Sequence, residues 1–416
     1  MLPKTNFDDN FFSFKNGYAI LTFIIKWTFI CIIIGALIGS ASAAFLVALD
    51  WVTNFRESNL WILFFLPIAG FAVACLYHFW GKNIEAGNNL LFSTIHQPKE
   101  IIPIKMAPFI FFGTIVTHLF GGSAGREGTA LQMAGAIADQ FSKPLKLSID
   151  ERRILIIAAI AAGFGSVFGT PIAGAIFGLE VLIASRINYH AIFPAFLASS
   201  IANNITKFWN VGHTQFNMGV LPQFSFLNLF YIILAGVVFG FYASLFCKSM
   251  HSYSAFYKTA IKFPPLRAFV GGLIIVCLIW ILGTTKYIGL GVPTIVDSFS
   301  RQLPMYDFLL KLIFTVLTIS AGFKGGEVTP LFFIGALLGN ALSYILPLPI
   351  GFLAGIGFVA VFAGATNCPL ACILMATELF GNECAIFVAV ACIVSYVVSG
   401  KSSIYSIHKI NATDNQ

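Results

Sequence analysis

The sequence predicts an all-α polytopic membrane protein, built from two related halves of tilted and broken helices. The chain is 58% hydrophobic and only 10% charged, with a mean hydropathy of +0.88, which is typical of a protein that crosses a bilayer several times. A glycine-rich phrase with a glutamate occurs in each half. Many apolar segments are shorter than the ~20 residues of a full span, and such short helices must be buried in protein or line a cavity.

The composition excludes several classes of protein. The net charge of +7 is not accompanied by a basic run interleaved with aromatic residues, so we expect no nucleic-acid partner. The cysteines lack the spacing of a metal site or of a secreted disulfide framework, and we expect no metal ion and no cofactor. They lie in or beside apolar runs, at Cys31, Cys75, Cys247, Cys277, Cys368, Cys372, Cys384 and Cys392.

The first apolar stretch, residues 19–49, is far too long for the core of a signal peptide. It predicts one long, tilted membrane helix in which Lys26 snorkels to the surface or packs inside the protein. Residues 61–80 predict a second span of bilayer length. Residues 81–105 are polar by comparison, and residues 106–120 form an apolar segment that leads into the first glycine-rich phrase.

The first half continues with segments of alternating polarity. The charged residues 143–153 predict a connection at a membrane surface. Residues 154–183 have a glycine-rich centre and a Thr-Pro step at Pro171, which predicts two helices that meet rather than one span. An apolar segment, 191–208, then precedes a polar link, 209–224.

The second half follows the same scheme. A basic and aromatic loop is expected at 248–262. We assign residues 1–215 to the first repeat and 216–416 to the second, with no cytoplasmic regulatory domain. Helices are expected at the apolar segments 226–247, 268–282, 308–321, 331–346, 351–365, 369–379 and 385–399.

The first glycine-rich phrase, residues 121–131, places Arg126 and Glu127 between glycines, with apolar segments on either side. A carboxylate at membrane depth is costly and indicates function. The glycines let backbone N–H groups approach a ligand closely, and the helix expected at 130–137 offers an N-terminus that favours anions. Glu127 therefore stands where an anion would bind, which predicts a gate; the alternative is a tight helix turn without function.

The phrase recurs 200 positions later, at residues 325–331. The matching residues, in order, are Glu127, Thr129, Leu131 and Gly135 with Glu327, Thr329, Leu331 and Gly335. Internal repeats with interrupted apolar segments at corresponding positions predict a transporter whose site lies between the halves.

A second echo follows each phrase. Pro171 is followed nine residues later by Glu180, and Pro369 is followed nine residues later by Glu378. Because these glutamates recur symmetrically without glycines around them, we expect both to anchor helix ends.

Gly125-Arg126-Glu127-Gly128 resembles the hallmark of the CLC family of chloride channels and proton-coupled anion antiporters, in which the glutamate is the gating carboxylate. Gly326 to Pro330 stands where that family carries Gly-x-Phe-x-Pro, and Tyr405 stands where it carries a tyrosine that touches the anion. The resemblance covers the membrane region. It implies two inverted-topology repeats, as in the CLC fold, and a homodimer in the lipid bilayer with one pore per subunit and with both termini cytoplasmic.

The departures from the family's pattern indicate one branch. Asn88 takes the place of the anion-binding serine, Thr129 replaces a proline, Val328 replaces a phenylalanine, and Glu327 is a carboxylate that chloride members lack. The internal proton-transfer glutamate of chloride/proton exchangers is expected near residues 209–214, which contain none. This combination resembles the fluoride/proton antiporters, bacterial proteins that export fluoride across the cytoplasmic membrane.

Fluoride is small and tightly hydrated, so a dry site must replace its water with strong donors. The Asn88 amide and the Tyr405 hydroxyl are suitable donors, and the edges of phenylalanine rings carry positive charge. Asn88 has the alternative role of a cap or turn residue, and Tyr405 that of an interfacial tyrosine. The residues predicted to bind the anion are Asn88, Tyr405, Gly125, Arg126, Gly128, Thr129, Gly326, Val328 and Thr329.

The predicted mechanism is alternate occupancy, in which ionised Glu127 competes with fluoride and carries a proton when it is neutralised. Glu327 is predicted to be a second protonation site or a charge that shapes the pathway. We expect the hydroxyls of Thr129 and Thr329 to bond back to their own helices rather than line the route, and His118 to be a core residue rather than part of a proton path. The alternatives are a chloride channel or chloride/proton antiporter of the same family, a passive fluoride channel, and an intramembrane enzyme; the sequence contains neither HExxH nor GxSxG.

Overall fold

The computed structural model describes residues 17–96, 100–181 and 188–405, and this part of the chain is helical without a β-strand. A single isolated β-bridge, between Gly125 and Gly326, lies in the described residues. The predicted all-α fold is confirmed.

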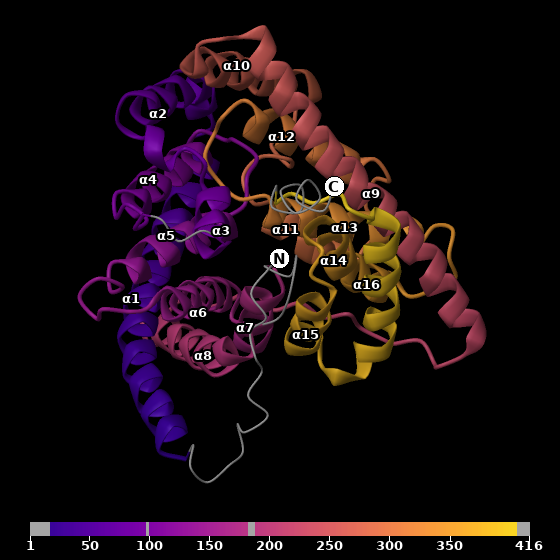
Figure 1. Ribbon diagram of the computed structural model, residues 1–416. Helices are drawn as coiled ribbons and strands as arrows, with labels where there is room; N and C mark the ends of the chain where they lie inside the picture. Colours follow the sequence, from indigo (N-terminus) through magenta and orange to yellow (C-terminus); the bar gives the residue numbers. More distant parts are fainter. Residues whose placement is uncertain (1–16, 97–99, 182–187, 406–416) are drawn as a thin grey trace, which may run out of the picture.

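The first half runs from the long helix α1 to the helix α8, and its helices appear in indigo to magenta in Figure 1. Its α-helices are α1 (Gly17–Ser58), α2 (Leu66–Trp80), α3 (Asn88–His96), α4 (Met106–Leu119), α5 (Glu127–Asp139), α6 (Ile149–Phe168), α7 (Pro171–Glu180) and α8 (Ile192–Phe208). Short 3-10 helices are η2 (Leu60–Phe65), η3 (Lys82–Ile84) and η4 (Tyr189–Ala191).

The second half repeats the order of long and short helices. Its helices are α9 (Phe226–Ala260), α10 (Pro264–Leu282), α11 (Val292–Ser298), α12 (Asp307–Ser320), α13 (Val328–Leu342), α14 (Ile350–Thr366), α15 (Pro369–Phe380), η5 (Asn382–Cys384) and α16 (Ala385–Ser399). The two halves lie side by side and meet where α7 packs against α15 (Figure 1). The repeat boundary after residue 215 and the inverted orientation of the halves stay predictions.

Five helical segments within the described residues are long and apolar enough to cross a membrane: Gly17–Ser58, Leu60–Trp80, Phe226–Ala260, Pro264–Leu282 and Asn382–Ser399. The helices next to the glycine-rich phrases are shorter, with 14 residues in α4, 13 in α5, 14 in α12 and 15 in α13. Helices of this length at membrane depth need protein around them. The residues of α5 and α13 are accordingly almost all buried.

The break that the sequence predicts at Pro171 is present. The helix α6 ends at Phe168, Gly169 adopts a left-handed φ of 76°, and α7 begins with Pro171. A glycine with positive φ allows the last carbonyl groups of a helix to be hydrogen-bonded. Proline is tolerated in the first turn of the next helix because the N–H groups there have no partner within the helix, so the one that proline lacks is not needed.

The expected loop at 248–262 is wrong, because α9 continues to Ala260. Residues 248–260 are more polar than the preceding segment, but they contain neither glycine nor proline, so nothing ends the helix before Pro264. The expected surface connection at 143–153 is also partly helical. Ser148 and Glu151 form a capping box at the start of α6, and Glu151 forms an ion pair with Lys26 on α1.

Close helix packing relies on small residues. A side chain at Gly335 of α13 would collide with the carbonyl oxygen of Gly357 on α14, and one at Gly357 would collide with that of Gly335. Small residues at such crossings let two backbones approach closely. This contact holds α13 against α14 and so positions the N-terminus of α13.

Candidate functional site

The two glycine-rich loops bond directly to each other. The N–H of Gly125 donates to the carbonyl of Gly326 at 2.5 Å, and the N–H of Gly326 donates to the carbonyl of Gly125 at 2.7 Å. Each loop opens with a left-handed glycine, Gly121 at φ 91° and Gly322 at φ 106°. The helices α5 and α13 begin shortly after the bridge, so their N-termini come together between the halves.

This pairing corrects the register of the sequence repeat. Glu127 is the first residue of α5, whereas Glu327 is the residue before α13. If the bridging glycines correspond, Glu327 stands opposite Arg126, and Val328 stands opposite Glu127. The sequence match of Glu127 with Glu327 is therefore shifted by one residue from the correspondence that the bridge indicates. One residue rotates a helical side chain by about 100°, so the two carboxylates need not point into equivalent places.

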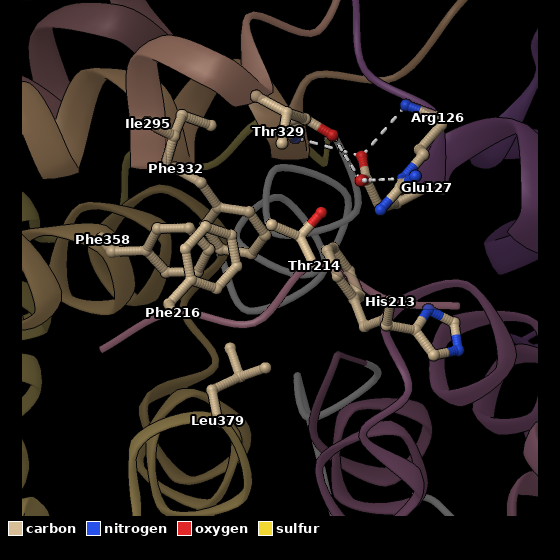
Figure 2. Close-up of a pocket in the computed structure, with 12 residues that line it drawn as sticks. Arg126, Glu127, His213, Thr214, Phe216, Ile295, Thr329, Phe332, Phe358 and Leu379 are labelled. Atoms are coloured by element: carbon tan, nitrogen blue, oxygen red, sulfur yellow. Dashed lines mark hydrogen bonds and ion pairs between the residues drawn. The ribbon is translucent and has the colours of Figure 1, made fainter. Parts of the chain in front are cut away.

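The carboxylate of Glu127 is fully buried and binds the N-terminus of α13. The backbone N–H of Thr329 donates to Oε2 at 3.0 Å, and the Thr329 hydroxyl donates to Oε1. The N–H of Arg126 donates to Oε2 at 3.1 Å, and the Arg126 Nε lies 3.7 Å from Oε1 (Figure 2). The predicted helix-end site is present, but it belongs to α13 of the other half rather than to the helix that Glu127 itself begins.

Glu127 lines a cavity of about 30 Å³, hereafter the Glu127 cavity. Figure 2 shows Glu127 and Arg126 on one side and the rings of Phe216, Phe332 and Phe358 on the other. Phe332 and Phe358 stack with their centroids 4.1 Å apart. The sequence left open which phenylalanines lie near the anion path, and the structure brings these rings and that of Phe168 to the carboxylate.

Glu327 lies elsewhere, in a second cavity of about 190 Å³ that we name the Glu327 cavity. Asn88 and Tyr405 line this same cavity, although they are far apart in the sequence. Glu327 is only partly buried, in contrast to Glu127. The structure therefore brings the predicted Asn88 and Tyr405 together with one of the two carboxylates and places the other in a separate cavity.

Asn88 and Tyr405 both present polar atoms without a partner. The Asn88 Oδ1 and the Tyr405 hydroxyl are buried and, among the described residues, accept or donate no hydrogen bond. Tyr405 is 4% exposed and its ring packs against Phe92 at 4.9 Å between centroids, so the alternative of an interfacial tyrosine is wrong. Asn88 begins α3, yet its side-chain oxygen caps no N–H in this part of the chain.

Gly128 explains why Asn88 can approach the loops. A Cβ at Gly128 would lie 2.9 Å from the Asn88 Nδ2 and 3.2 Å from the Cα of Gly326. A side chain at this position would push the Asn88 amide away and crowd the Gly326 backbone, so glycine lets the amide lie close to the start of α5. The amide nitrogen is thereby held against the glycine-rich loops, as an anion donor would need to be.

The two threonines differ from the expectation. The Thr329 hydroxyl donates to Glu127, and the Thr129 hydroxyl is paired with that of Thr114 at 2.7 Å. The prediction that both bond back to their own helices is wrong, because a buried neighbour offers each hydroxyl a partner. Val328 is buried and lines neither cavity.

The glutamates of the second echo form a reciprocal pair of helix caps. Glu180 accepts from the N–H groups of Leu370 and Ala371 at 3.0 and 2.7 Å, at the start of α15. Glu378 accepts from those of Ile172 and Ala173 at 3.0 and 2.7 Å, at the start of α7. The prediction that they anchor helix ends is confirmed, and each does so across the boundary between the halves.

The remaining candidates are placed as follows. His118 is fully buried and lines neither cavity. His213 and Thr214, from the polar link at 209–224, also line the Glu127 cavity (Figure 2).

In the described residues no group of three His, Cys, Asp or Glu side chains is arranged to hold a metal ion. Lys324, which the sequence reasoning missed, lines the Glu327 cavity.

Comparison with known proteins relates this geometry to a family. A family profile described as "Voltage gated chloride channel" matches residues 69–400. A chloride/fluoride channel protein of Pseudomonas syringae pv. tomato is 50% identical over 397 residues, which cover 94% of this chain and 88% of the relative. The H(+)/Cl(−) exchange transporter ClcA of Salmonella schwarzengrund is 26% identical over 388 residues, which cover 85% of this chain and 81% of the relative.

Solved structures of CLC-type antiporters share the fold of this chain. The crystal structure of a CLC-type fluoride/proton antiporter superposes with a TM-score of 0.90 at 35% identity, covering 94% of this chain and 98% of that one. A slow cyanobacterial Cl⁻/H⁺ antiporter superposes with a TM-score of 0.80 at 19% identity, covering 94% and 99% of the two chains, which is a likeness of fold alone.

Proposed function

The chain belongs to the voltage gated chloride channel (CLC) family, and we propose that within it this protein exchanges fluoride for protons. It is an anion channel or antiporter embedded in a membrane, as its family is. The finer assignment is supported most by one observation: Asn88, Tyr405 and Glu327 line one cavity, while Glu127 occupies the adjoining helix end.

The donors fit a strongly hydrated anion. A dry site holds fluoride only if it replaces the water that the ion gives up. The Asn88 Nδ2 at the start of α5 and the Tyr405 hydroxyl are donors on the wall of the Glu327 cavity, and the hydroxyl has no other partner among the described residues. Hydrogen bonds to a charged group contribute about 1.5–3 kcal/mol each beyond the bonds to water that they replace, so each such donor favours the anion at this wall.

Glu127 acts as the gate by competing with the anion. Its ionised carboxylate accepts bonds from the Thr329 N–H and hydroxyl and from the Arg126 N–H, which together make the N-terminus of α13 an occupied anion site. When Glu127 takes up a proton, its negative charge is lost and its bonds to these donors weaken. Fluoride then takes the donors, and Glu127 carries the proton away from them.

Glu327 is the second protonatable group of the proposed exchange. It is separated from Glu127 by the Gly125–Gly326 bridge and opens to the larger cavity. A carboxylate there takes a proton from water in the cavity and passes it toward the loops. Its negative charge also limits how much anion accumulates in the cavity at one time.

The setting of the proposal follows from the family. We propose a homodimer with one anion path per subunit, located in the bacterial cytoplasmic membrane with both termini on the cytoplasmic side. Fluoride leaves the cell as protons enter. The partners are therefore fluoride, protons, the lipid bilayer and a second copy of the chain.

The test is a liposome assay that records fluoride and pH together. Purified protein is reconstituted with internal fluoride, and efflux is followed with a fluoride electrode while an external pH electrode follows protons. We expect fluoride efflux accompanied by proton uptake at a constant ratio. Fluoride efflux without proton movement would establish a passive channel, which the name of the Pseudomonas relative favours.

Chloride efflux in place of fluoride efflux would establish the function named for the Salmonella relative. The same liposomes loaded with chloride decide this point. We expect chloride efflux to be at least about tenfold slower than fluoride efflux, because the amide and hydroxyl donors favour a small anion with a strong field.

A further inference from the structure

Lys324 is held in a defined position on the wall of the Glu327 cavity. It lies in the loop between α12 and α13, before the bridging glycine. Its stem passes over α4 at Gly113, where a Cβ would stand 2.9 Å from the Lys324 Cγ and 3.0 Å from its Cβ. Its ammonium lies 3.9 Å from the centroid of the Tyr77 ring, and Tyr77 is itself held edge-to-face by Phe109.

The ammonium of Lys324 lies on the cavity wall without a carboxylate bound to it in the described part of the chain. Among the described residues, no carboxylate oxygen lies within the 4.0 Å of an ion pair with its Nζ. The aromatic ring stabilises the cation through its negative face without neutralising it. Two other cationic side chains near the loops do have partners. Arg126 forms an ion pair with Glu127, and Lys311 donates hydrogen bonds to two backbone carbonyls outside this cavity.

The charge balance of the cavity requires such a cation if an anion is to enter. The charged residues on its wall are Glu85, Glu327 and Lys324. Without Lys324 the wall carries carboxylates alone, and a cleft with walls of low dielectric constant focuses their repulsion on an entering anion. At about 190 Å³ the space admits several water molecules, so a partly hydrated anion fits beside the lysine.

The geometry points to Lys324 as the residue that draws fluoride into the Glu327 cavity and delivers it to Asn88 and Tyr405. Tyr77 and Gly113 are its positioning residues, the first by its ring and the second by its missing side chain. Glu85 opposes Lys324 from the same wall. This role rests on the proposed exchange of fluoride for protons and adds a step that precedes binding at the loops.

The experiment compares fluoride transport by the wild type, Lys324→Met and Lys324→Arg in liposomes over a range of fluoride concentrations. Methionine keeps the stem over Gly113 but removes the charge, whereas arginine keeps the charge. We expect Lys324→Met to raise the half-saturating fluoride concentration about tenfold, with the maximal rate and the ratio of protons to fluoride unchanged. Lys324→Arg should stay within about twofold of the wild type. Lys105→Gln, a half-buried lysine outside both cavities that donates to the Trp80 carbonyl at 2.7 Å, is the matched control.

A second variant tests the sign of the effect on a residue that is exposed. Glu85→Gln removes a negative charge from the same wall and should lower the half-saturating concentration about threefold. An inert salt such as potassium gluconate should raise this concentration for the wild type and lower it for Lys324→Met, because screening weakens the attraction of the lysine in the first and the repulsion of the remaining Glu85 and Glu327 in the second.

An unchanged half-saturating concentration in Lys324→Met, or an equal rise in Lys324→Met and Lys324→Arg, would overturn the role of Lys324. A rise rather than a fall in Glu85→Gln would do so as well, and this variant decides the matter if the lysine variants fail to assemble. A wild type that moves no proton-coupled fluoride would instead overturn the proposed function, so the two failures are distinguishable.

Discussion

Glu127 and Glu327 lie in neighbouring loops but differ in burial, in hydrogen bonding and in the cavity they reach. Glu127 is fully buried and is held by donors of α13, beside a cavity of about 30 Å³. Glu327 is partly exposed to a cavity of about 190 Å³ that Asn88 and Tyr405 share. One carboxylate is therefore locked onto a helix end, and the other is open to water.

The cause of the difference is the register of the two loops. The bridge pairs Gly125 with Gly326, so Glu327 occupies the place of Arg126 rather than that of Glu127. In an inverted repeat, corresponding residues point toward opposite sides of the membrane. Arg126 lines the Glu127 cavity, and Glu327 lines the other one, which agrees with this correspondence. A shift of one residue thus gives the protein a carboxylate on each side of the bridge.

The largest expected effect is that of Glu127→Gln. Glutamine fills the same space but carries no proton, so proton movement coupled to fluoride should fall at least about 100-fold while fluoride still moves. The measurement is the paired fluoride and pH recording in liposomes. Glu383→Gln, an exposed carboxylate outside both cavities, is the control. Retained proton coupling in Glu127→Gln would remove Glu127 from its role as gate.

A smaller effect is expected for Glu327→Gln. Because Glu327 adjoins a cavity with room for several water molecules, water can partly replace it as a proton carrier. We expect the coupled rate to fall about tenfold with the ratio of protons to fluoride preserved. The same recordings check this outcome. A loss of proton coupling as large as that of Glu127→Gln would contradict the different roles proposed for Glu127 and Glu327 and would indicate that both carboxylates carry the same proton in sequence.

Thr329→Val tests the helix end that Glu127 and fluoride are proposed to share. The variant removes the hydroxyl that donates to Glu127. Losing one bond to a charged group should raise the half-saturating fluoride concentration about tenfold. Thr117→Val removes a buried hydroxyl that donates only to the Gly113 carbonyl at 2.9 Å and serves as the matched control. A similar rise in both variants would show that packing, not the donor, is responsible.

The smallest effect concerns stability, because each half has one glutamate that caps a helix of the other half. Glu180→Gln and Glu378→Gln each weaken a cap that crosses between the halves. Each should lower the free energy of unfolding by about 1–2 kcal/mol, read as a similar fall in the midpoint of thermal unfolding in detergent. A fall in only one variant would show that the symmetry of these caps is geometric but not energetic.

The sequence alone identified the membrane class, most helices, the break at Pro171 and the caps at Glu180 and Glu378. The class, the helices and the break depend on hydropathy and on proline and glycine chemistry, which act over a few residues. The caps were predicted from the symmetric recurrence of the two glutamates, although the helix ends that they cap lie 190 and 206 residues away. The resemblance to a family predicted Asn88, Tyr405 and Glu127 as site residues; the structure places the first two in one cavity and Glu127 at the N-terminus of α13. The end of α9 at Ala260 was missed because a drop in hydropathy does not end a helix that has no glycine or proline.

Only the tertiary structure decided which helix end Glu127 occupies, that Glu327 corresponds to Arg126, and that Lys324 shares a cavity with Asn88 and Tyr405. Each of these depends on contacts between segments far apart in the sequence, and the identity of neighbouring residues carries no information about such contacts. A repeat read along the chain also tolerates a shift of one residue. The hydrogen bonds between the two glycines do not, because their reciprocal geometry admits a single register.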